Sequence, residues 1–475
     1  MGDVTEVVSK VSVPGLTADE QDALNRNLTR LVGRRRINLL RSTLYDGKHV
    51  ASAVRSGVVP AQYERMGICL GWSAKAADAL TRRTQLEGFS WAGGDLDATG
   101  LPVVERENFL TSEISLALSD SVLHGISFLV TTRGLDGEPT ALVHARDALN
   151  ATGSWDPRVR RLRDALTVTR WSSDDDRRPD AFVLYLNNLT VTCERVDGKW
   201  SVLRSEHSWG VPVEPLVYRP RASRRYGQSR LTPAIMGLHR QAIRELIRLE
   251  GHMDIYSYPE FWLLGGDMSA FKNADGSQRA VWQVMLGRIK GLEDNENKPD
   301  SLARPDVKQF PAASPQPHGD ALDLLSRAFA REASLPDSAV ALKGLSNPTS
   351  ADAYDASQYE LIAEAEGAMR DWGTPIVRTV ARALAIYGGE TGVPDAFHEI
   401  SPRWLGAKFE SRAARADAGA KQIASVPWLA ETEVGLELLG LSPEQREAAL
   451  SERRRAQATS LAATLAGAAR DDVAE

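Results

Sequence analysis

The sequence has few of the features that mark secreted, membrane-bound or disulfide-rich proteins. Its 475 residues include two cysteines, Cys69 and Cys193, so a disulfide framework is excluded and a reducing compartment is favoured. We expect both thiols to be buried as small apolar side chains. Apolar runs stay below the roughly 18 residues that a membrane-spanning helix needs, and residues 1–6 lack the basic and apolar regions of a signal peptide. We therefore expect a soluble protein that contacts no membrane.

Motifs for nucleotide, metal or covalent chemistry are also missing. The sequence contains no GxxxxGK[ST] phosphate loop, no GxGxxG after a strand, no HExxH, no paired CxxC and no GxSxG. Single histidines such as His124, His144 and His207 have no second ligand one helical turn away, which favours structural roles over metal binding. The run Asp174-Asp175-Asp176 offers oxygen ligands to a divalent cation, but a solvated turn is favoured. The sequence thus predicts no catalytic residue, metal or cofactor.

The charge balance argues against a protein that grips nucleic acid over its whole surface. The net charge is −6, and non-specific affinity for DNA grows with the number of phosphates that a protein neutralises. We expect the local arginine clusters to be solvated faces or salt-bridged contacts, with a phosphate-facing patch as the alternative. These clusters are Arg34–Arg36, then Arg158, Arg160, Arg161 and Arg163, and then Arg219, Arg221, Arg224 and Arg225.

Periodicity in the first half of the chain predicts helices followed by a β region. Leucines at helical spacing predict a helix over 18–45, capped by Thr17 or Asp19, and similar patterns predict helices at 73–85 and 105–123. From 127 to 205 the period changes to two, and Asp197-Gly198 indicates a hairpin turn. The predicted strands are 127–131, 141–145, 166–170, 181–186, 189–195 and 200–204. The first 220 residues are therefore expected to form one α+β domain with antiparallel strands.

The second half is expected to be mainly helical. A helix from Pro233 to about 255 and another over 319–333 are separated by an irregular insertion and followed by a long loop, 335–349. Structureless loops of this length in compact domains are normally functional or disordered, so function is expected in the insertion and the loop. The apolar stripe predicted for the first helix is Ile235, Leu238, Ala242, Leu246, Leu249 and Met253. Further helices are predicted over 351–387, with a kink at Pro375, and over 411–423, 431–439 and 443–469.

Short motifs stand at the junctions between these parts. They are Tyr45-Asp46-Gly47-Lys48-His49, Leu86-Glu87-Gly88-Phe89, Gly125-Ile126-Ser127-Phe128, Tyr226-Gly227-Gln228-Ser229, Leu335-Pro336, Ser350-Ala351-Asp352-Ala353, and Ala416-Asp417-Ala418 with Lys421. In order and spacing the chain resembles the portal proteins of tailed bacteriophages, in the large family typical of siphophages. The likeness covers residues from about 20 to 455.

The resemblance implies an α+β, predominantly helical portal fold assembled as a ring, usually of about twelve subunits. The implied parts are a wing (1–225, with antiparallel strands over about 127–205), stem helices (226–255 and 318–334), a clip (256–317), a tunnel loop (335–349), a long kinked helix returning to the wing (350–388) and a helical crown with a frayed C-terminal tail (389–475).

The same resemblance implies a channel at one capsid vertex through which double-stranded DNA is packaged and ejected. The ring would dock the terminase large subunit, then the head-tail connector, and would contact major capsid and scaffolding proteins in a virion assembled in the bacterial cytoplasm. Candidate DNA-channel residues are Lys343, Ser346 and Asn347. Candidate docking residues in the clip are Phe261, Trp262, Trp282, Arg288 and Lys290. Two alternatives stay open: a DNA-processing enzyme that uses Asp174–Asp176 and the arginine clusters, and a capsid adaptor protein without a channel.

Overall fold

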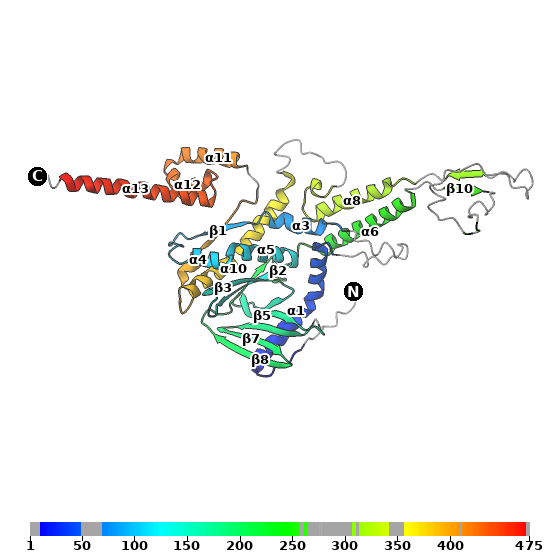
Figure 1. Ribbon diagram of the computed structural model, residues 1–475, viewed down its shortest axis with the longest axis horizontal. Helices are drawn as coiled ribbons and strands as arrows, with labels where there is room; N and C mark the ends of the chain where they lie inside the picture. Colours follow the sequence, from blue (N-terminus) through cyan, green and yellow to red (C-terminus); the bar gives the residue numbers. More distant parts are fainter. Residues whose placement is uncertain are drawn as a thin grey trace, which may run out of the picture. The chain divides into compact units, whose positions relative to one another are not determined.

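The computed structural model describes residues 10–48, 69–175, 177–256, 261–264, 275, 277, 306–309, 313–341, 356–408 and 411–471. The chain divides into two compact units, residues 1–405 and residues 406–475. Both contain helices, and the larger unit also contains the sheets (Figure 1). Within the described ranges, no helix combines the length and the apolar character that crossing a bilayer requires.

The larger unit has the α+β composition expected from the sequence. Its helices are α1 (Ala18–Tyr45), α3 (Trp72–Thr81), α4 (Leu101–Asn108), α5 (Leu110–His124), α6 (Pro233–Tyr256), α8 (Gln316–Glu332) and α10 (Tyr359–Tyr387), with 3-10 turns η3 (Asp337–Ala339) and η4 (Asp395–Glu399). Its strands are β1 (Leu86–Ser90), β2 (Ile126–Arg133), β3 (Ala141–Arg146), β4 (Ala151–Asp156), β5 (Arg161–Trp171), β6 (Pro179–Leu186), β7 (Leu189–Val196), β8 (Lys199–Glu206), β9 (Val213–Val217), β10 (Phe261–Leu264), β11 (Asp306–Gln309) and β12 (Ser401–Trp404).

Two antiparallel sheets form the centre of this unit. One has the strand order β3-β2-β9 and the other the order β4-β5-β6-β7-β8. A core of Ile126, Phe128, Val130, Val213, Ala165 and Tyr185 takes residues from both sheets, so the sheets pack face to face. The β7–β8 hairpin turns at Asp197-Gly198, where both residues have positive φ, as a two-residue primed turn requires.

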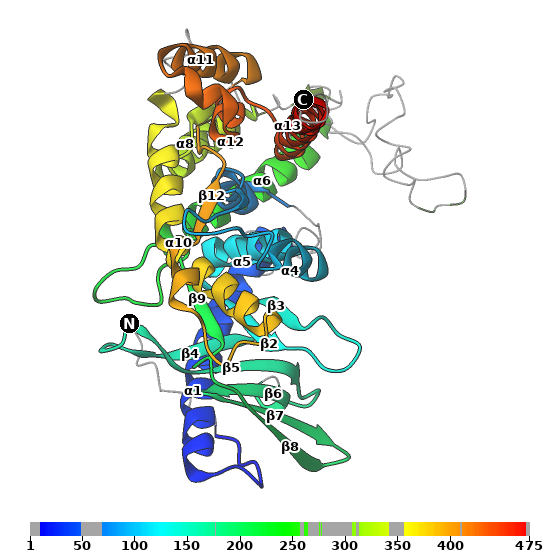
Figure 2. The same ribbon diagram turned by 90° about the vertical axis from the view of Figure 1, so that its left-hand side faces the viewer.

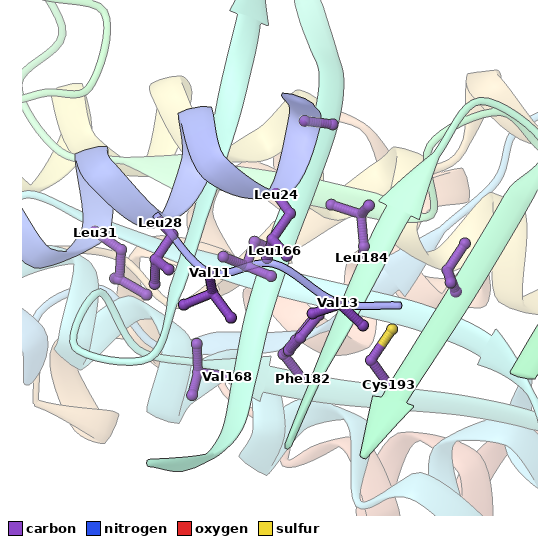
Figure 3. Close-up of a cluster of buried hydrophobic side chains, with 12 residues drawn as sticks. Val11, Val13, Leu24, Leu28, Leu31, Leu166, Val168, Phe182, Leu184 and Cys193 are labelled. Carbon is purple, nitrogen blue, oxygen red and sulfur yellow. The ribbon is translucent and has the colours of Figure 1, made fainter. Parts of the chain in front are cut away.

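Helix α1 covers the outer face of the five-stranded sheet (Figure 2). Because side chains alternate along a strand, Leu166 and Leu184 point away from the inter-sheet core and meet Leu24, Leu28 and Leu31 of α1 (Figure 3). The N-terminal segment adds Val11 and Val13 to the same cluster. This second core fixes α1 to the strands.

Helices α5 and α10 cover the outer face of the three-stranded sheet. Ser121 of α5 donates to the carbonyl oxygen of Leu216 in β9 over 2.9 Å. In α10, Arg382 pairs with Glu214 of the same strand over 2.7 Å, and both side chains are buried. The larger unit therefore has four layers in the order α1, five-stranded sheet, three-stranded sheet, α5 with α10.

The start of α1 confirms the cap predicted from the sequence. The Thr17 hydroxyl accepts from the amide of Glu20, and the Glu20 carboxylate accepts from the amide of Thr17, which forms a capping box. Arg204 of β8 also donates to Glu20. These contacts fix the first turn of α1 to the edge strand of the sheet.

The structure differs from the sequence predictions in several respects. The helix predicted over 105–123 is two helices, because Phe109 adopts a left-handed conformation (φ 49°) between α4 and α5. Strands β4, β9 and β12 were not predicted, and β12 (Ser401–Trp404) lies in the region after 389 that was expected to be helical. Cys69 is exposed rather than buried, whereas Cys193 is buried as expected, and burial raises the pKa of Cys193 to about 12.

The smaller unit is helical. It contains α11 (Arg412–Ser425), the 3-10 turn η5 (Pro427–Glu431), α12 (Glu433–Leu438) and α13 (Pro443–Asp471). Gly419 of α11 lies so close to the backbone of Leu438 that a Cβ would approach its carbonyl oxygen to 2.1 Å. The buried Arg446 of α13 pairs with Glu437 over 2.9 Å, so α11, α12 and α13 are joined by backbone packing and one ion pair.

We predict that Asp164→Asn destabilises the protein. Asp164 is buried and accepts from Arg26 over 2.8 Å and Asn27 over 2.6 Å. Losing these charge-assisted bonds should lower the free energy of unfolding at pH 7 by about 1–3 kcal/mol, as measured by chemical denaturation. An exposed ion-pair variant on the same sheet, Glu194→Gln, should lose less than about 1 kcal/mol.

The effect should depend on pH. Burial opposes ionisation of Asp164, but hydrogen bonds from Asn27, Ser154 and Arg26 outweigh it and lower the pKa of the carboxyl. A lowered folded-state pKa contributes stability above the unfolded value of about 4, and this contribution is lost as the pH falls through the folded-state pKa. The difference between wild type and Asp164→Asn should therefore shrink below about pH 4. A difference independent of pH would contradict the assignment.

Candidate functional site

Most of the residues predicted to act lie outside the described part of the chain. These are Lys343, Ser346 and Asn347 of the loop, and Trp282, Arg288 and Lys290 of the insertion. Phe261 and Trp262 lie in β10, whose backbone pairs antiparallel with β11. The insertion between helices α6 and α8 therefore contains a two-stranded antiparallel ribbon.

Helices α6 and α8 run antiparallel, side by side (Figure 1). His252 near the end of α6 lies against His318 near the start of α8, with ring centroids 5.0 Å apart. At the opposite end, Arg230, just before α6, donates to the carbonyl oxygen of Ala333, just after α8, over 2.6 Å. The insertion leaves and returns at the first end, and the loop after α8 begins at the second.

The buried face of α6 differs from the predicted stripe. Ile235 and Ala242 are buried as expected, but Met253 is 45% exposed, and Leu238, Leu246 and Leu249 are half-buried. The residues buried in place of these are Met236, His239, Ile243 and Ile247. The face is rotated because α6 packs on α3 as well as on α8, and Ser73 of α3 shares a 2.5 Å hydrogen bond with His239.

Polar contacts join the two helices next to the insertion. Glu245 of α6 lies 2.6 Å from the His318 ring of α8 and 3.0 Å from Arg248. Burial alone would raise the pKa of Glu245, but the hydrogen bonds from His318 and Arg248 lower it below the ordinary glutamate value. The His252 ring lies 2.9 Å from the carbonyl oxygen of Ala313, in the segment that leads into α8. The end of the insertion is thus tied to α6.

The opposite end of the helix pair rests on α3. The Trp72 ring lies 5.1 Å from the Phe329 ring of α8, and Ser73 is hydrogen-bonded to His239 of α6. Helix α3 therefore contacts both members of the pair within one helical turn of its own sequence.

Two of the junction motifs contact each other at this end. The amide of Tyr218 donates to the carbonyl oxygen of Gly125 over 3.0 Å, and Gln228 donates back to Tyr218 over 2.9 Å. A Cβ on Gly227 would lie 2.4 Å from the Gly125 oxygen, and a Cβ on Gly125 would lie 2.8 Å from the amide of Ser229. Both glycines have positive φ. Only residues without a Cβ allow this backbone contact.

The Tyr226 and Ser229 side chains extend the contact. The Tyr226 hydroxyl donates to the carbonyl oxygen of Gly153 and accepts from the amide of Trp155. Ser229 donates to the carbonyl oxygen of Leu123 at the end of α5 over 2.6 Å. The motif thus fixes the chain that enters α6 to both sheets and to α5.

Arg230 follows this motif and is buried, with 2% of its surface exposed. Its Nε donates to the carbonyl oxygen of Ala76 in α3 over 2.6 Å, and one terminal nitrogen donates to Ala333 over the same distance. The other terminal nitrogen donates to the Glu364 carboxylate of α10 and to the Tyr218 hydroxyl. The Tyr218 hydroxyl also donates to Glu364. One guanidinium therefore joins α3, the end of α8 and α10.

The Arg230 guanidinium stays charged in this buried position. Burial opposes the charge, but Tyr218 and Glu364 outweigh it and raise the pKa of Arg230 above the ordinary arginine value. The pKa of Tyr218 is raised by burial in the same cluster, so its hydroxyl stays protonated as a donor.

The other sequence candidates are structural or lie on the surface. Asp174 and Asp175 are exposed in the turn between β5 and β6, and Asp175 accepts from the amide of Arg177. Asp176 lies outside the described residues. In the part of the chain that the structure describes, no three acidic, histidine or cysteine residues come together as metal ligands.

Each arginine cluster has a member with an internal partner. Arg35 lies over the Trp171 ring at 4.5 Å, Arg163 lies 3.2 Å from Asp164, and Arg219 lies 3.7 Å from Glu364. Among the histidines, His124 is buried, and burial lowers its pKa to about 4, which favours a neutral structural ring.

Comparison with known proteins decides what this architecture belongs to. Residues 33–427 match the model of the family described as phage portal protein, SPP1 Gp6-like. The chain belongs to this phage portal protein family. Similar curated relatives are the portal protein of Mycobacterium phage L5, 25% identical over 416 residues (86% of this chain and 82% of the relative), and that of Mycobacterium phage D29, 25% identical over 397 residues (82% and 79%). The chain is thus a phage portal protein.

Among solved structures, this portal protein is similar to chains from the neck of an empty GTA particle, computed with C6 symmetry, and of a native GTA particle, computed with C12 symmetry. In both cases the TM-score is 0.41 and the identity 15%, with 84% of this chain and 99% of the other covered.

Sequence reasoning missed Arg230, Glu364 and Glu214. The available signals were an arginine directly after the Tyr226-Gly227-Gln228-Ser229 motif and a carboxylate inside the apolar segment Val213–Val217. Both features place a charge where an apolar environment is expected, and such charges need partners. The sequence alone does not name those partners.

We predict that Gly227→Ala strongly destabilises this portal protein. The added methyl group would lie 2.3 Å from the Tyr218 oxygen at a positive φ, so the free energy of unfolding should fall by at least about 2 kcal/mol. Gly237 is a matched control, since it lies in α6 with nothing within 4 Å of its Cβ position, and Gly237→Ala should stabilise by about 0.5–1 kcal/mol. Equal effects in thermal melting would contradict the account.

Proposed function

We propose that this portal protein forms a ring at one capsid vertex and that double-stranded DNA is packaged and ejected through its centre. The observation that carries the proposal is the family match over residues 33–427. A subunit that contacts its neighbour through two different faces closes a ring when the rotation is repeated about one axis. A ring of about twelve subunits is the assembly that the portal resemblance implies.

In this proposal the parts of the chain have separate tasks. The four-layer body, which lies within residues 1–225 and is completed by α10, is the wing. The stem is the predicted ranges 226–255 and 318–334, which correspond to helices α6 and α8 to within two residues at the ends next to the insertion, and residues 256–317 are the clip. Residues 335–349 are the tunnel loop, and the helices after 389 form the crown. The antiparallel α6–α8 pair supports this division because it connects the insertion at one end to the loop at the other.

The second apolar face of α6 supports contact between neighbouring subunits. Leu238, Leu246 and Leu249 are half-buried and Met253 is exposed in the single chain, although all four are large apolar side chains. Leu324 of α8 is 70% exposed. Apolar faces of this kind mark protein contacts, and a neighbouring subunit in the ring would cover them.

The charge of the protein suits a conduit. Since non-specific binding depends on the number of phosphate contacts, a chain with a net charge of −6 retains DNA weakly and lets it slide. Lys343, Ser346 and Asn347 remain the proposed contacts with DNA. We place the docking of the terminase large subunit and then of the head-tail connector on the clip, through Phe261, Trp262, Trp282, Arg288 and Lys290. Major capsid and scaffolding proteins would surround the ring.

We predict that deleting residues 338–347 leaves ring formation intact but abolishes DNA packaging. The deletion removes the proposed tunnel loop while α6, α8 and their contacts remain. Ring mass would be measured by mass photometry and packaging by the nuclease-protected DNA of particles assembled in the host. Normal packaging by the deletion variant would contradict the tunnel-loop assignment and favour an adaptor without a channel.

A second variant tests the enzyme alternative. Replacing Asp174, Asp175 and Asp176 together by alanine should leave both ring formation and packaging unchanged, because these residues form a surface turn in the proposal. Loss of packaging with intact rings would instead favour a carboxylate-dependent DNA-processing activity.

A further inference from the structure

Arg230 contacts the chain at both ends of the segment that contains the proposed tunnel loop. On one side it donates to Ala333, directly after α8, and on the other to Glu364, in the second turn of α10. A third bond, to Ala76, ties the same guanidinium to α3 in the body. A single side chain therefore contacts the chain both where it leaves α8 and near the start of α10.

The geometry of arginine suits this task. A guanidinium is a rigid planar fork whose donors point in fixed directions, so three acceptors bound to it are held at fixed separations from one another. A positive charge beside the last carbonyl groups of α8 is also favourable for that helix end. Lysine carries the same charge but only one nitrogen, and it cannot contact Ala76, Ala333 and Glu364 together in this geometry.

The α10 side of the contact is firmly seated. Tyr218, directly after β9, bonds to Glu364, and Arg382 bonds to Glu214 within β9. Helix α10 is thus attached to the central sheet at two points along its length. On the α8 side, the links to the body include the Trp72–Phe329 ring contact and the Arg230 bond to Ala333.

We propose that Arg230 is the positioning residue of this portal protein: it couples the α6–α8 pair to α10, and so transmits a displacement of the helix pair to both ends of the intervening segment. The significance for DNA passage rests on the proposed function. The coupling itself is a property of the folded subunit and is tested without DNA.

The test is a distance measurement between spin labels on α8 and α10. Arg331 of α8 and Tyr359 of α10 are exposed, so Arg331→Cys and Tyr359→Cys would carry the labels, and the exposed Cys69 would be replaced by serine. Cys193 is buried and its pKa is raised to about 12, so it should stay unlabelled. Labelled full-length chain would be diluted with unlabelled chain before assembly, so that distances within one subunit dominate.

With Arg230 present, the distance distribution should be single and narrow. Arg230→Lys should give a broad or split distribution, because the charge remains but the fixed fork is lost. Arg219→Lys is the matched control: Arg219 also lies near Glu364, at 3.7 Å, but its side chain is 56% exposed and it should leave the distribution narrow. Asp164→Asn is a second control: it should destabilise the protein through the loss of bonds from Arg26 and Asn27, neither of which belongs to this cluster, and it should also leave the distribution narrow.

A narrow, unshifted distribution for Arg230→Lys would overturn the proposal. If Arg230→Lys does not fold, Tyr218→Phe replaces it, because this change removes one hydroxyl from the cluster and keeps the ring. Tyr218→Phe should then broaden the distribution, and an unchanged distribution would overturn the proposal equally. DNA packaging is measured on the same variants. A broadened distance distribution with normal packaging would support the coupling by Arg230 and contradict the tunnel-loop function. Failure of the coupling and failure of the proposed function are therefore distinguishable.

Discussion

One buried charge holds together the junction on which this portal protein depends. Moving a guanidinium out of water costs several kcal/mol unless its donors find acceptors. Arg230 offsets this cost with a carboxylate, two carbonyl oxygens and a hydroxyl from four separate parts of the chain. Apolar replacement of buried ion pairs is often neutral for stability. We therefore attribute to Arg230 a role in fixing geometry more than in adding stability.

The surrounding architecture explains why the junction can be so specific. Four packed layers provide a rigid body, and Gly125 and Gly227 let the chain that enters α6 approach the end of α5 at backbone distance. Helix α6 then begins at a fixed place and in a fixed direction. At its other end, the contacts of Glu245 and His252 hold the return of the insertion to the same helix. The α6–α8 pair is thus held at both ends. Between these two ends, the apolar side chains Leu238, Leu246, Leu249 and Met253 of α6 remain half-buried or exposed in the single chain.

Much of the fold follows from local patterns. The cap at Thr17 and the turn at Asp197-Gly198 are set by neighbours in sequence, and the structure has them as predicted. Strand β4 was missed because Ala-Thr-Gly-Ser-Trp-Asp shows no apolar alternation, and its pairing with β5 supplies what local propensity does not. The break at Phe109 was missed because bulky residues rarely adopt positive φ.

The cluster around Arg230 could not be predicted from local sequence patterns, because its members come from distant parts of the chain. Ala76, Ala333 and Glu364 are far apart in sequence, and two of them act through backbone oxygens that every residue possesses. The buried face of α6 was misplaced because periodicity indicates which residues are apolar but not which elements pack on the helix, and α6 packs on both α3 and α8. The motifs did indicate the family correctly. Two of them, at Gly125 and at Tyr226-Gly227-Gln228-Ser229, contact each other at the start of α6.

The central claim is that the chain forms a ring around a DNA channel. Its most direct test is a three-dimensional electron-microscopy map of the assembled protein, in which the symmetry axis and the subunits around it are resolved. The account predicts a closed ring in which the exposed apolar face of α6 contacts the neighbouring subunit and residues 335–349 lie nearest the axis. A ring whose bore is lined by the five-stranded sheet, with residues 335–349 on the outer surface, would contradict it.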